Sequence, residues 1–267
     1  KSSKNDTNVA KDASILSIVR QVAGIIAPVL GAFILLMSNS KVLIIASVVV
    51  LVLSVVPLLK IKNISDKPKK ATKSFRKFFK SWDVRKDYIL TSFYGVHCVV
   101  ESTIWPLFIF LFFNSIESVA ALSVIVSITT IIFTFFVGHF TKERRVYMVA
   151  VGGVFISLIW LMRLFIENGA FYYFSVFLVG LFSVVISIPL DSNLFEKGEK
   201  LDALTTATWR NAVYMFTYML VFGTLALLIS VFKVSFVLAA LSMSAVAIVS
   251  VIFSGVFFKR KNKFLPF

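Results

Sequence analysis

Residues 146–166 read VYMVAVGGVFISLIWLMRLFI and residues 170–190 read AFYYFSVFLVGLFSVVISIPL, with only Glu167, Asn168 and Gly169 between them. Each run has about the 20 predominantly apolar residues that a helix needs to cross the hydrocarbon core of a bilayer. Backbone amides in that core must be satisfied within the protein, which restricts spanning segments to helices and closed barrels. A barrel strand has about 10 residues with alternating hydrophobicity. These longer, continuous runs therefore predict transmembrane helices.

Similar apolar runs occupy most of the chain. The 267 residues are 58% hydrophobic and 15% charged, whereas soluble domains are about 45–50% apolar and about 25% charged. This excess of apolar residues is expected to face lipid. We predict an all-α, polytopic transmembrane bundle of about eight spans, at residues 13–38, 42–60, 88–113, 117–138, 146–166, 170–190, 203–231 and 234–258.

The basic residues are concentrated in alternate connections between these runs. The chain has 28 Lys and Arg against 13 Asp and Glu, an excess that in a soluble domain would suggest nucleic-acid binding. Here eleven of them lie between Lys60 and Lys86, whereas the connections on the other side hold only Lys41 and Lys233. The positive-inside rule therefore predicts that both termini are cytoplasmic. We expect the membrane to be the plasma membrane (the cytoplasmic or cell inner membrane). No nucleic-acid partner is expected.

The longest connection, residues 61–87, divides the chain. We expect residues 1–60 to form two helices that end an N-terminal half, and residues 88–267 to form a six-helix C-terminal bundle. Within the connection, residues 73–82 are amphipathic. Their aromatic residues recur at i, i+3, i+4 and i+7, opposite four cations: Phe75, Phe78, Phe79 and Trp82, against Lys73, Arg76, Lys77 and Lys80. This pattern predicts an interfacial helix on anionic lipid, although a target helix for a calmodulin-like protein or for nucleic acid has a similar pattern.

Several kinds of chemistry are not indicated by the sequence. Cys98 is the only cysteine, and His97 and His139 lie far apart, so neither disulfides nor a Cys or His metal site is expected. We find no phosphate-binding loop and no Gly-rich dinucleotide turn. A membrane-embedded transferase would need a pair of catalytic polar residues at the interface, and none is visible. We therefore expect neither an enzyme nor a cofactor.

Two short motifs carry a family resemblance. Residues 24–32 read GIIAPVLGA, in which Gly24, Pro28 and Gly31 stand in the first predicted span. They resemble the Gly-Pro-x-x-Gly-Gly signature in the fifth helix of the major facilitator superfamily, with alanines in place of two glycines. Residues 138–145 read GHFTKERR. They resemble the Gly-x-x-x-Asp-Arg-x-Gly-Arg-Arg loop after helices two and eight, through the residues Gly138, Arg144 and Arg145. This copy is two residues shorter and has no Asp.

The order of the motifs supports the resemblance. A fifth-helix motif, one more helix, a long basic loop, two helices, the eighth-helix loop and four helices follow the family order over the whole chain. The chain then corresponds to helices five to twelve. It also lacks an initiating Met, so we expect helices one to four from a longer reading frame or an equivalent from a partner chain.

The resemblance implies a mode of action. Members of the family have two six-helix halves that rock about a central cavity, where substrate and coupling ions bind near the bilayer midplane. The fifth-helix motif is associated in that family with drug and proton antiport. The resemblance therefore implies a secondary active transporter of a small solute or drug-like molecule. The alternative is a membrane scaffold or receptor that keeps the helix bundle without a transport cycle.

Ionisable residues inside the spans are the candidate site residues, because they are costly in a bilayer and commonly functional. Glu101 lies in the middle of the third span, one helical turn after His97. A carboxylate in a low-dielectric cavity binds a proton more readily than one in water, so Glu101 could carry a proton with His97 as its neighbour; a structural pair is the alternative. Arg163, near the outer end of its span, could instead extend to the surface. Further pathway candidates are Arg20, Gln21, Arg210, Asn211, Trp105 and Trp209.

Overall fold

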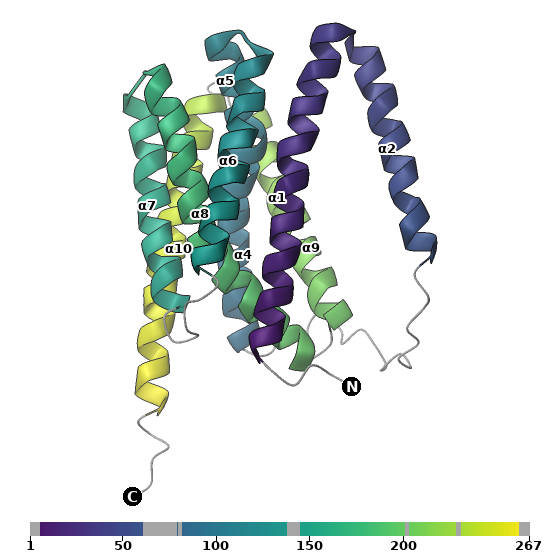
Figure 1. Cartoon of the computed structure of the whole chain (residues 1–267). Helices are drawn as coiled ribbons and strands as arrows, with labels where there is room; N and C mark the ends of the chain where they lie inside the picture. The colour runs from purple at the N-terminus through teal and green to yellow at the C-terminus, as the bar shows by residue number, and fades with distance from the viewer. Residues whose placement is uncertain are drawn as a thin grey trace, which may run out of the picture.

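The computed structural model describes residues 6–60, 79, 82–137, 145–200, 203–227 and 231–261. Within these ranges every element is helical, which confirms the all-α prediction (Figure 1). The elements are α1 (Asp6–Met37), α2 (Ser40–Lys60), α4 (Trp82–Val99), a π-helix η1 (Val100–Ile104), α5 (Trp105–Phe113), α6 (Ile116–Val137), α7 (Arg145–Phe165), α8 (Gly169–Lys200), α9 (Ala203–Ala226) and α10 (Val231–Lys261).

Each predicted span contains a helix, and five segments are long and apolar enough to cross a membrane. These segments are Val84–Phe113, Ile116–Val137, Arg145–Phe165, Gly169–Leu194 and Val231–Ile252. Two shorter apolar helices, Gln21–Met37 and Ser40–Val56, occupy the first two predicted spans. α9 does not reach the same hydropathy, because Arg210 and Asn211 lie in its second turn. It remains a predicted span.

Two helices extend beyond the predicted spans. α4 begins at Trp82 rather than at residue 88, and its segment that is apolar enough to cross a membrane begins at Val84, so Trp82 is continuous with the third helix of the prediction. Apart from Phe79 and Trp82, residues 73–82 lie outside the described residues, and the interfacial helix remains a prediction. α8 continues to Lys200 rather than ending at residue 190, because its last ten residues are polar but helical, and Pro189 lies within the helix without ending it.

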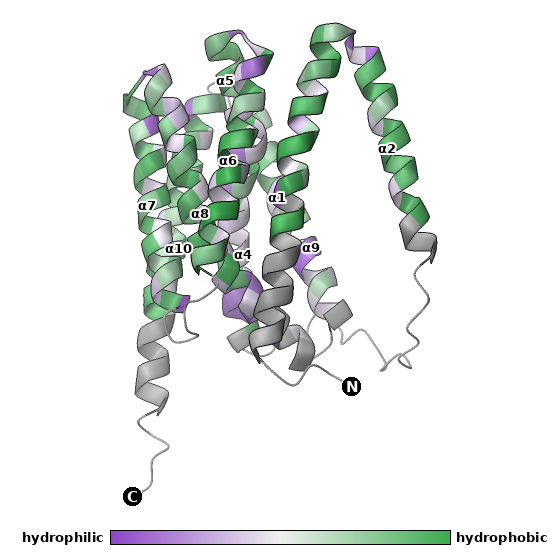
Figure 2. Cartoon of the chain, viewed as in Figure 1, coloured by the Kyte–Doolittle hydropathy of each residue, from purple (hydrophilic) through white to green (hydrophobic). Residues whose placement is uncertain are grey.

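α4, η1 and α5 form one continuous helical segment, and successive segments run antiparallel, so α1 begins and α10 ends at the same end of the molecule, the lower end in Figure 1. The main buried core is formed by residues of α4 to α10, from Leu90 to Val246. α1 packs beside this bundle against α6 and α8, whereas α2 is connected mainly to α1. The side chains of α2 are nearly all exposed between Ser40 and Val56, and they are almost all apolar (Figure 2).

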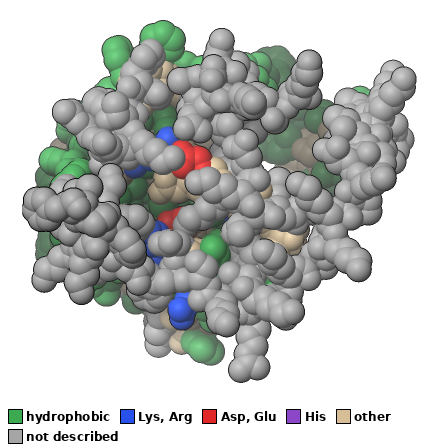
Figure 3. Space-filling view, turned by 90° about the horizontal axis from the view of Figure 1, so that it is seen from below, with side chains coloured by type: hydrophobic (Ala, Val, Ile, Leu, Met, Phe, Trp, Pro, Cys, Tyr) green, Lys and Arg blue, Asp and Glu red, His purple; other side chains and the backbone are tan. Residues whose placement is uncertain are grey.

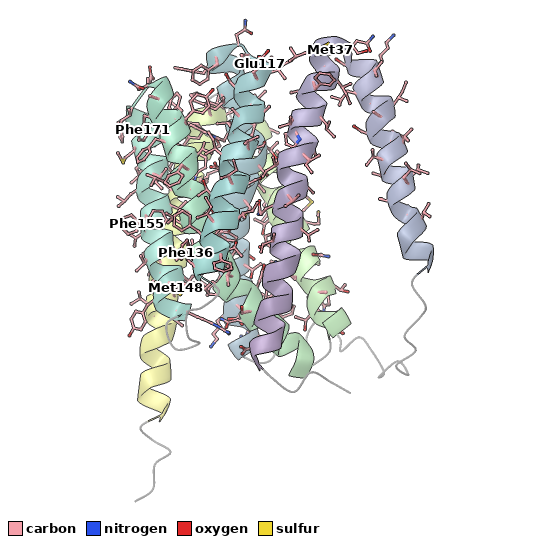
Figure 4. The ribbon with its side chains drawn as sticks, viewed as in Figure 1. Met37, Glu117, Phe136, Met148, Phe155 and Phe171 are labelled. Atoms are coloured by element: carbon pink, nitrogen blue, oxygen red, sulfur yellow. The ribbon has the colours of Figure 1, made fainter. Side chains whose placement is uncertain are left out.

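The outer surface of the bundle is apolar as well. Phe136 on α6 and Phe155 on α7 lie on this surface (Figure 4), and 62% and 45% of these residues are exposed. A soluble protein rarely exposes contiguous apolar surface on this scale. The pattern fits helices that are surrounded by lipid.

Close helix contacts depend on glycine where α7 meets α10. A Cβ on Gly153 would lie 2.9 Å from the carbonyl oxygen of Met243 and 3.0 Å from the backbone nitrogen of Ala247. Both are backbone atoms of α10, so they cannot move aside independently of their helix. The small residue therefore sets the distance between the two helices, as expected for packing in membranes.

The third span is interrupted by η1 just before a proline. Pro106 has no N–H to donate to the carbonyl four residues earlier, and its ring would clash with that carbonyl in a regular α-helix. The backbone N–H of Trp105 instead bonds to the carbonyl oxygen of Val100, five residues back. Single π-turns of this kind are frequent at functional sites. This one contains Glu101.

Candidate functional site

A buried ion pair joins η1 to α7. Arg163 Nη1 lies 2.6 Å from Glu101 Oε2, and Nη2 lies 3.3 Å from Oε1, so the two groups form a bidentate pair. Arg163 Nε also donates to Ser175 Oγ on α8, over 2.9 Å. The Arg163 side chain is 0% exposed and that of Glu101 is 14% exposed. Arg163 therefore does not extend to the surface, and Glu101 is the accessible member of the pair.

Two tryptophans enclose the guanidinium of Arg163. Its central carbon lies 3.6 Å from the ring centre of Trp105 and 4.5 Å from that of Trp160. A cation over an indole face is attracted by the ring quadrupole, and the attraction is strongest away from water. Trp105 is 1% exposed, and its Nε1 has no hydrogen-bond partner among the described residues. The ring of Trp105 thus contacts the cation through its face.

His97 has a different partner from the one predicted. Trp160 Nε1 lies 2.9 Å from His97 Nδ1, and His97 Nε2 lies 3.4 Å from Ser183 Oγ. Because an indole N–H can only donate, Nδ1 must accept and carries no proton. The imidazole is then neutral, with its proton on Nε2, directed to Ser183. His97 therefore positions Trp160, and protonation of Nδ1 would break this bond.

Other ion pairs join the helices at the lower end of the bundle. Arg210 on α9 pairs with Asp191 on α8, with side chains 24% and 29% exposed. Arg145, at the start of α7, donates to Glu196 Oε1 over 2.7 Å and to Asn193 Oδ1 over 3.3 Å. Figure 3 shows acidic and basic side chains meeting on this face. Partly exposed pairs of this type contribute about 0–1 kcal/mol each to stability.

The structure separates the remaining predicted site residues. Gln21 is half-buried on α1, Asn211 is exposed on α9, and Trp209 packs edge-on against Phe79 near the lower end. Among the predicted pathway residues, Glu101, His97 and Trp105 lie together, each in contact with Arg163 or Trp160. The side chain of Arg20, and Gly138 and Arg144 as a whole, lie outside the described part of the chain.

Sequence reasoning considered Arg163 but did not pair it with Glu101. The two residues are 62 positions apart, and no local spacing connects them. The available signal was an arginine one helical turn after Trp160 in an otherwise apolar run. The described residues contain no group of three His, Cys, Asp or Glu side chains suited to a metal ion.

Comparison with protein-family models matches residues 5–200 to the major facilitator superfamily. The chain belongs to this superfamily. No curated protein and no solved structure matches it. Superfamily members are typically transporters rather than enzymes, so the chain is an integral membrane protein of a transport family. The matched residues include both motifs, Glu101 and Arg163.

The glycines of α1 that resemble the fifth-helix signature differ in how closely they approach neighbouring helices. A Cβ on Gly24 would lie 2.9 Å from Ser127 Oγ on α6, so a larger residue would have to displace this hydroxyl. A Cβ on Gly31 would meet Leu43 of α2 at an ordinary 3.8 Å. The first glycine of the motif therefore permits the close approach of α1 to the bundle.

Proposed function

We propose that this superfamily member is a secondary active transporter that works by alternating access. Its substrate is a small solute or drug-like molecule, exchanged for protons, and Glu101 is the proton-carrying group. The observation that supports this proposal is the enclosed Glu101–Arg163 pair at the π-helical break of the third span.

The physical cost of the pair argues for a functional role. Each ion loses its hydration when it is buried, and the attraction between the ions often fails to offset that loss, so apolar replacements are commonly as stable. Ionisable residues inside membrane spans are for that reason rare, and they mark ion and substrate pathways. The adjoining residues Ser102 and Thr103 are exposed, and under this proposal water and substrate would reach the carboxylate past them.

Protonation of Glu101 would be linked to a conformational change. A protonated carboxyl can no longer neutralise Arg163, whose guanidinium would then be an unpaired, enclosed cation. Removing one partner of a buried pair costs about 3–5 kcal/mol. A state in which Arg163 gains water or an anion would therefore become more favourable when Glu101 binds a proton.

The membrane orientation belongs to the same proposal. We place the lower end in the cytoplasm of a plasma membrane, because basic residues are concentrated in the connections on that side. Residues 73–82 would contact anionic lipid there. Further helices, from a longer chain or from a partner, would cover the exposed faces of α2 and α9 and close the central cavity.

Proton-driven uptake into proteoliposomes tests the proposal. The full chain is reconstituted, and a panel of fluorescent organic cations is supplied with and without an imposed pH gradient. We expect gradient-dependent uptake for the native chain, and uptake by Glu101→Gln that no longer depends on pH. Asp191→Asn, which removes a charge from a partly exposed pair, is the matched control. Uptake by Glu101→Gln with an unchanged pH profile would exclude Glu101 as the proton carrier.

A scaffold or receptor is the second candidate. Nε, Nη1 and Nη2 of Arg163 each donate to an acceptor, and these three hydrogen bonds would also suit a permanent connection between η1, α7 and α8. Under this alternative the pH gradient drives no uptake of any solute in the panel, even with the native chain.

A further inference from the structure

A second site lies at the upper end of the bundle, and the exposed residues that flank Glu101 are not among those that line it. A pocket of about 400 Å³ opens there between the ends of α5, α7, α8 and α10. This volume is within the range of sites for small molecules, roughly 300–1,000 Å³. Glu101 is not among the residues that line it.

The floor and walls of the pocket are aromatic. Phe108 packs edge-on against Tyr172, Phe232 and Phe236, with ring centres 5.3–5.5 Å apart. Tyr172 and Phe236 are 1% and 3% exposed, so they form the floor. Clusters of aromatic faces bind apolar groups, and they also attract ammonium groups.

The rim carries two opposite charges. Glu167, in the connection between α7 and α8, and Lys233, in the first turn of α10, both line the pocket and are exposed. Arg163 contributes to the inner wall, but its guanidinium is enclosed and paired with Glu101. The two charged groups that a ligand can reach, Glu167 and Lys233, are therefore equal in number and opposite in sign. In addition, the N-terminal end of a helix favours a negative group, which adds to the effect of Lys233.

We propose that this pocket binds a small zwitterion on an apolar body, with its ammonium group at Glu167 and the aromatic rings and its acidic group at Lys233. A cation alone would leave Lys233 unmatched, and an anion alone would leave Glu167 unmatched. Two sources supply this chemistry: a free apolar amino acid, or the headgroup of an ethanolamine phospholipid at the membrane surface.

Binding to the full chain in nanodiscs tests the proposal. L-phenylalanine is the free probe, followed by calorimetric titration. Phosphatidylethanolamine, added in increasing fraction to phosphatidylglycerol nanodiscs, is the lipid probe, followed by the melting temperature. We expect saturable binding of one of the two, which identifies the source. Tetramethylammonium and acetate, which each carry one charge, are expected to bind at least about tenfold more weakly, because each loses one charged contact.

Charge exchange across the rim gives the decisive comparison. Glu167→Lys and Lys233→Glu are each expected to weaken binding by about tenfold or more. The double variant restores an opposite pair and should recover binding of the reversed zwitterion. Glu117→Gln, at the same end of the bundle (Figure 4), and Lys41→Gln, in the first turn of α2, remove one charge each and should change nothing.

Three results would overturn the proposal. They are the absence of saturable binding for both probes, binding that ignores the single rim variants, and a double variant as weak as the single ones. Transport by Glu101 does not enter any of these measurements, so the pocket and the proposed transport function stand or fall separately.

Discussion

Removal of one partner from the Glu101–Arg163 pair should destabilise the protein strongly. In Glu101→Gln the Arg163 guanidinium keeps its charge, with a side chain that is 0% exposed. Loss of one partner of a buried pair costs about 3–5 kcal/mol. Because Glu101 is 14% exposed and the tryptophans still contact the cation, we expect the lower value, about 3 kcal/mol. At about 2–4 °C per kcal/mol for a chain of this size, the melting temperature should fall by about 6–12 °C.

Neutralising both partners should restore most of the loss. In Glu101→Gln/Arg163→Met neither member of the pair carries a charge, and methionine fills part of the space between the tryptophans. Replacement of a buried pair by apolar residues is commonly neutral or stabilising. Ser175 keeps a partner, because its hydroxyl donates to the carbonyl oxygen of Tyr172 over 2.7 Å. The double variant should therefore melt close to the native protein.

Thermal unfolding in detergent, followed by tryptophan fluorescence, measures these differences. Asp191→Asn is the reference variant for the loss of a partly exposed pair. Its pair with Arg210 is 24–29% exposed and should contribute at most about 1 kcal/mol to stability. A melting temperature for Glu101→Gln within about 2 °C of the native value would refute the reasoning. So would a double variant as unstable as the single one, because the cost would then not come from the uncompensated charge.

Three further outcomes are expected in the same unfolding assay. Gly153→Ala should destabilise the protein by about 1–3 kcal/mol through overpacking against the backbone of α10. The control Gly223→Ala, with nothing within 4 Å of the added Cβ, should be neutral or stabilising by up to about 1 kcal/mol. Equal effects of the two substitutions would contradict the close contact at Gly153. His97→Leu should cost about 1–3 kcal/mol, because a buried tryptophan N–H loses its acceptor, and a neutral result would argue against that bond. Ser157→Ala removes a hydroxyl that donates over 2.9 Å to a carbonyl oxygen of α10. It should lower the stability by only about 0.6 kcal/mol, the average for such bonds in membranes. A loss of stability as large as that of His97→Leu would contradict this value.

Hydropathy was sufficient to locate the helices along the chain, but it did not indicate which residues contact one another between helices. In the part of the chain that the structure describes, the predicted apolar runs are helical, because backbone amides in a bilayer must be satisfied within the protein. The ends at Trp82 and Lys200 were missed, since polar helix beyond a span leaves no hydropathy signal. A proline such as Pro106 can kink a helix, but the sequence did not indicate that the chain would respond with a π-turn around Glu101.

The candidate site was predicted in part. Glu101 was selected because an acid within a span is costly, and the structure shows it buried in a pair. Its expected neighbour was His97, on the assumption of regular α-helical spacing, but η1 begins between them and His97 bonds to Trp160 instead. Arg163 comes from another helix, and only tertiary packing brings it to Glu101. Contacts across the bundle have no signature in local spacing.

The π-turn also fixes the rotational phase of the third span. Successive residues of an α-helix are about 100° apart around its axis, and one extra residue in a turn rotates everything beyond it by about that angle. Phe108, which packs in the aromatic cluster, follows η1, whereas Tyr94 and His97 precede it. Deletion of a single residue from positions 100–104 would leave the hydropathy profile almost unchanged. It would nevertheless turn the outer third of the helix by about a quarter of a circle, and the rings that now face the bundle would face the lipid.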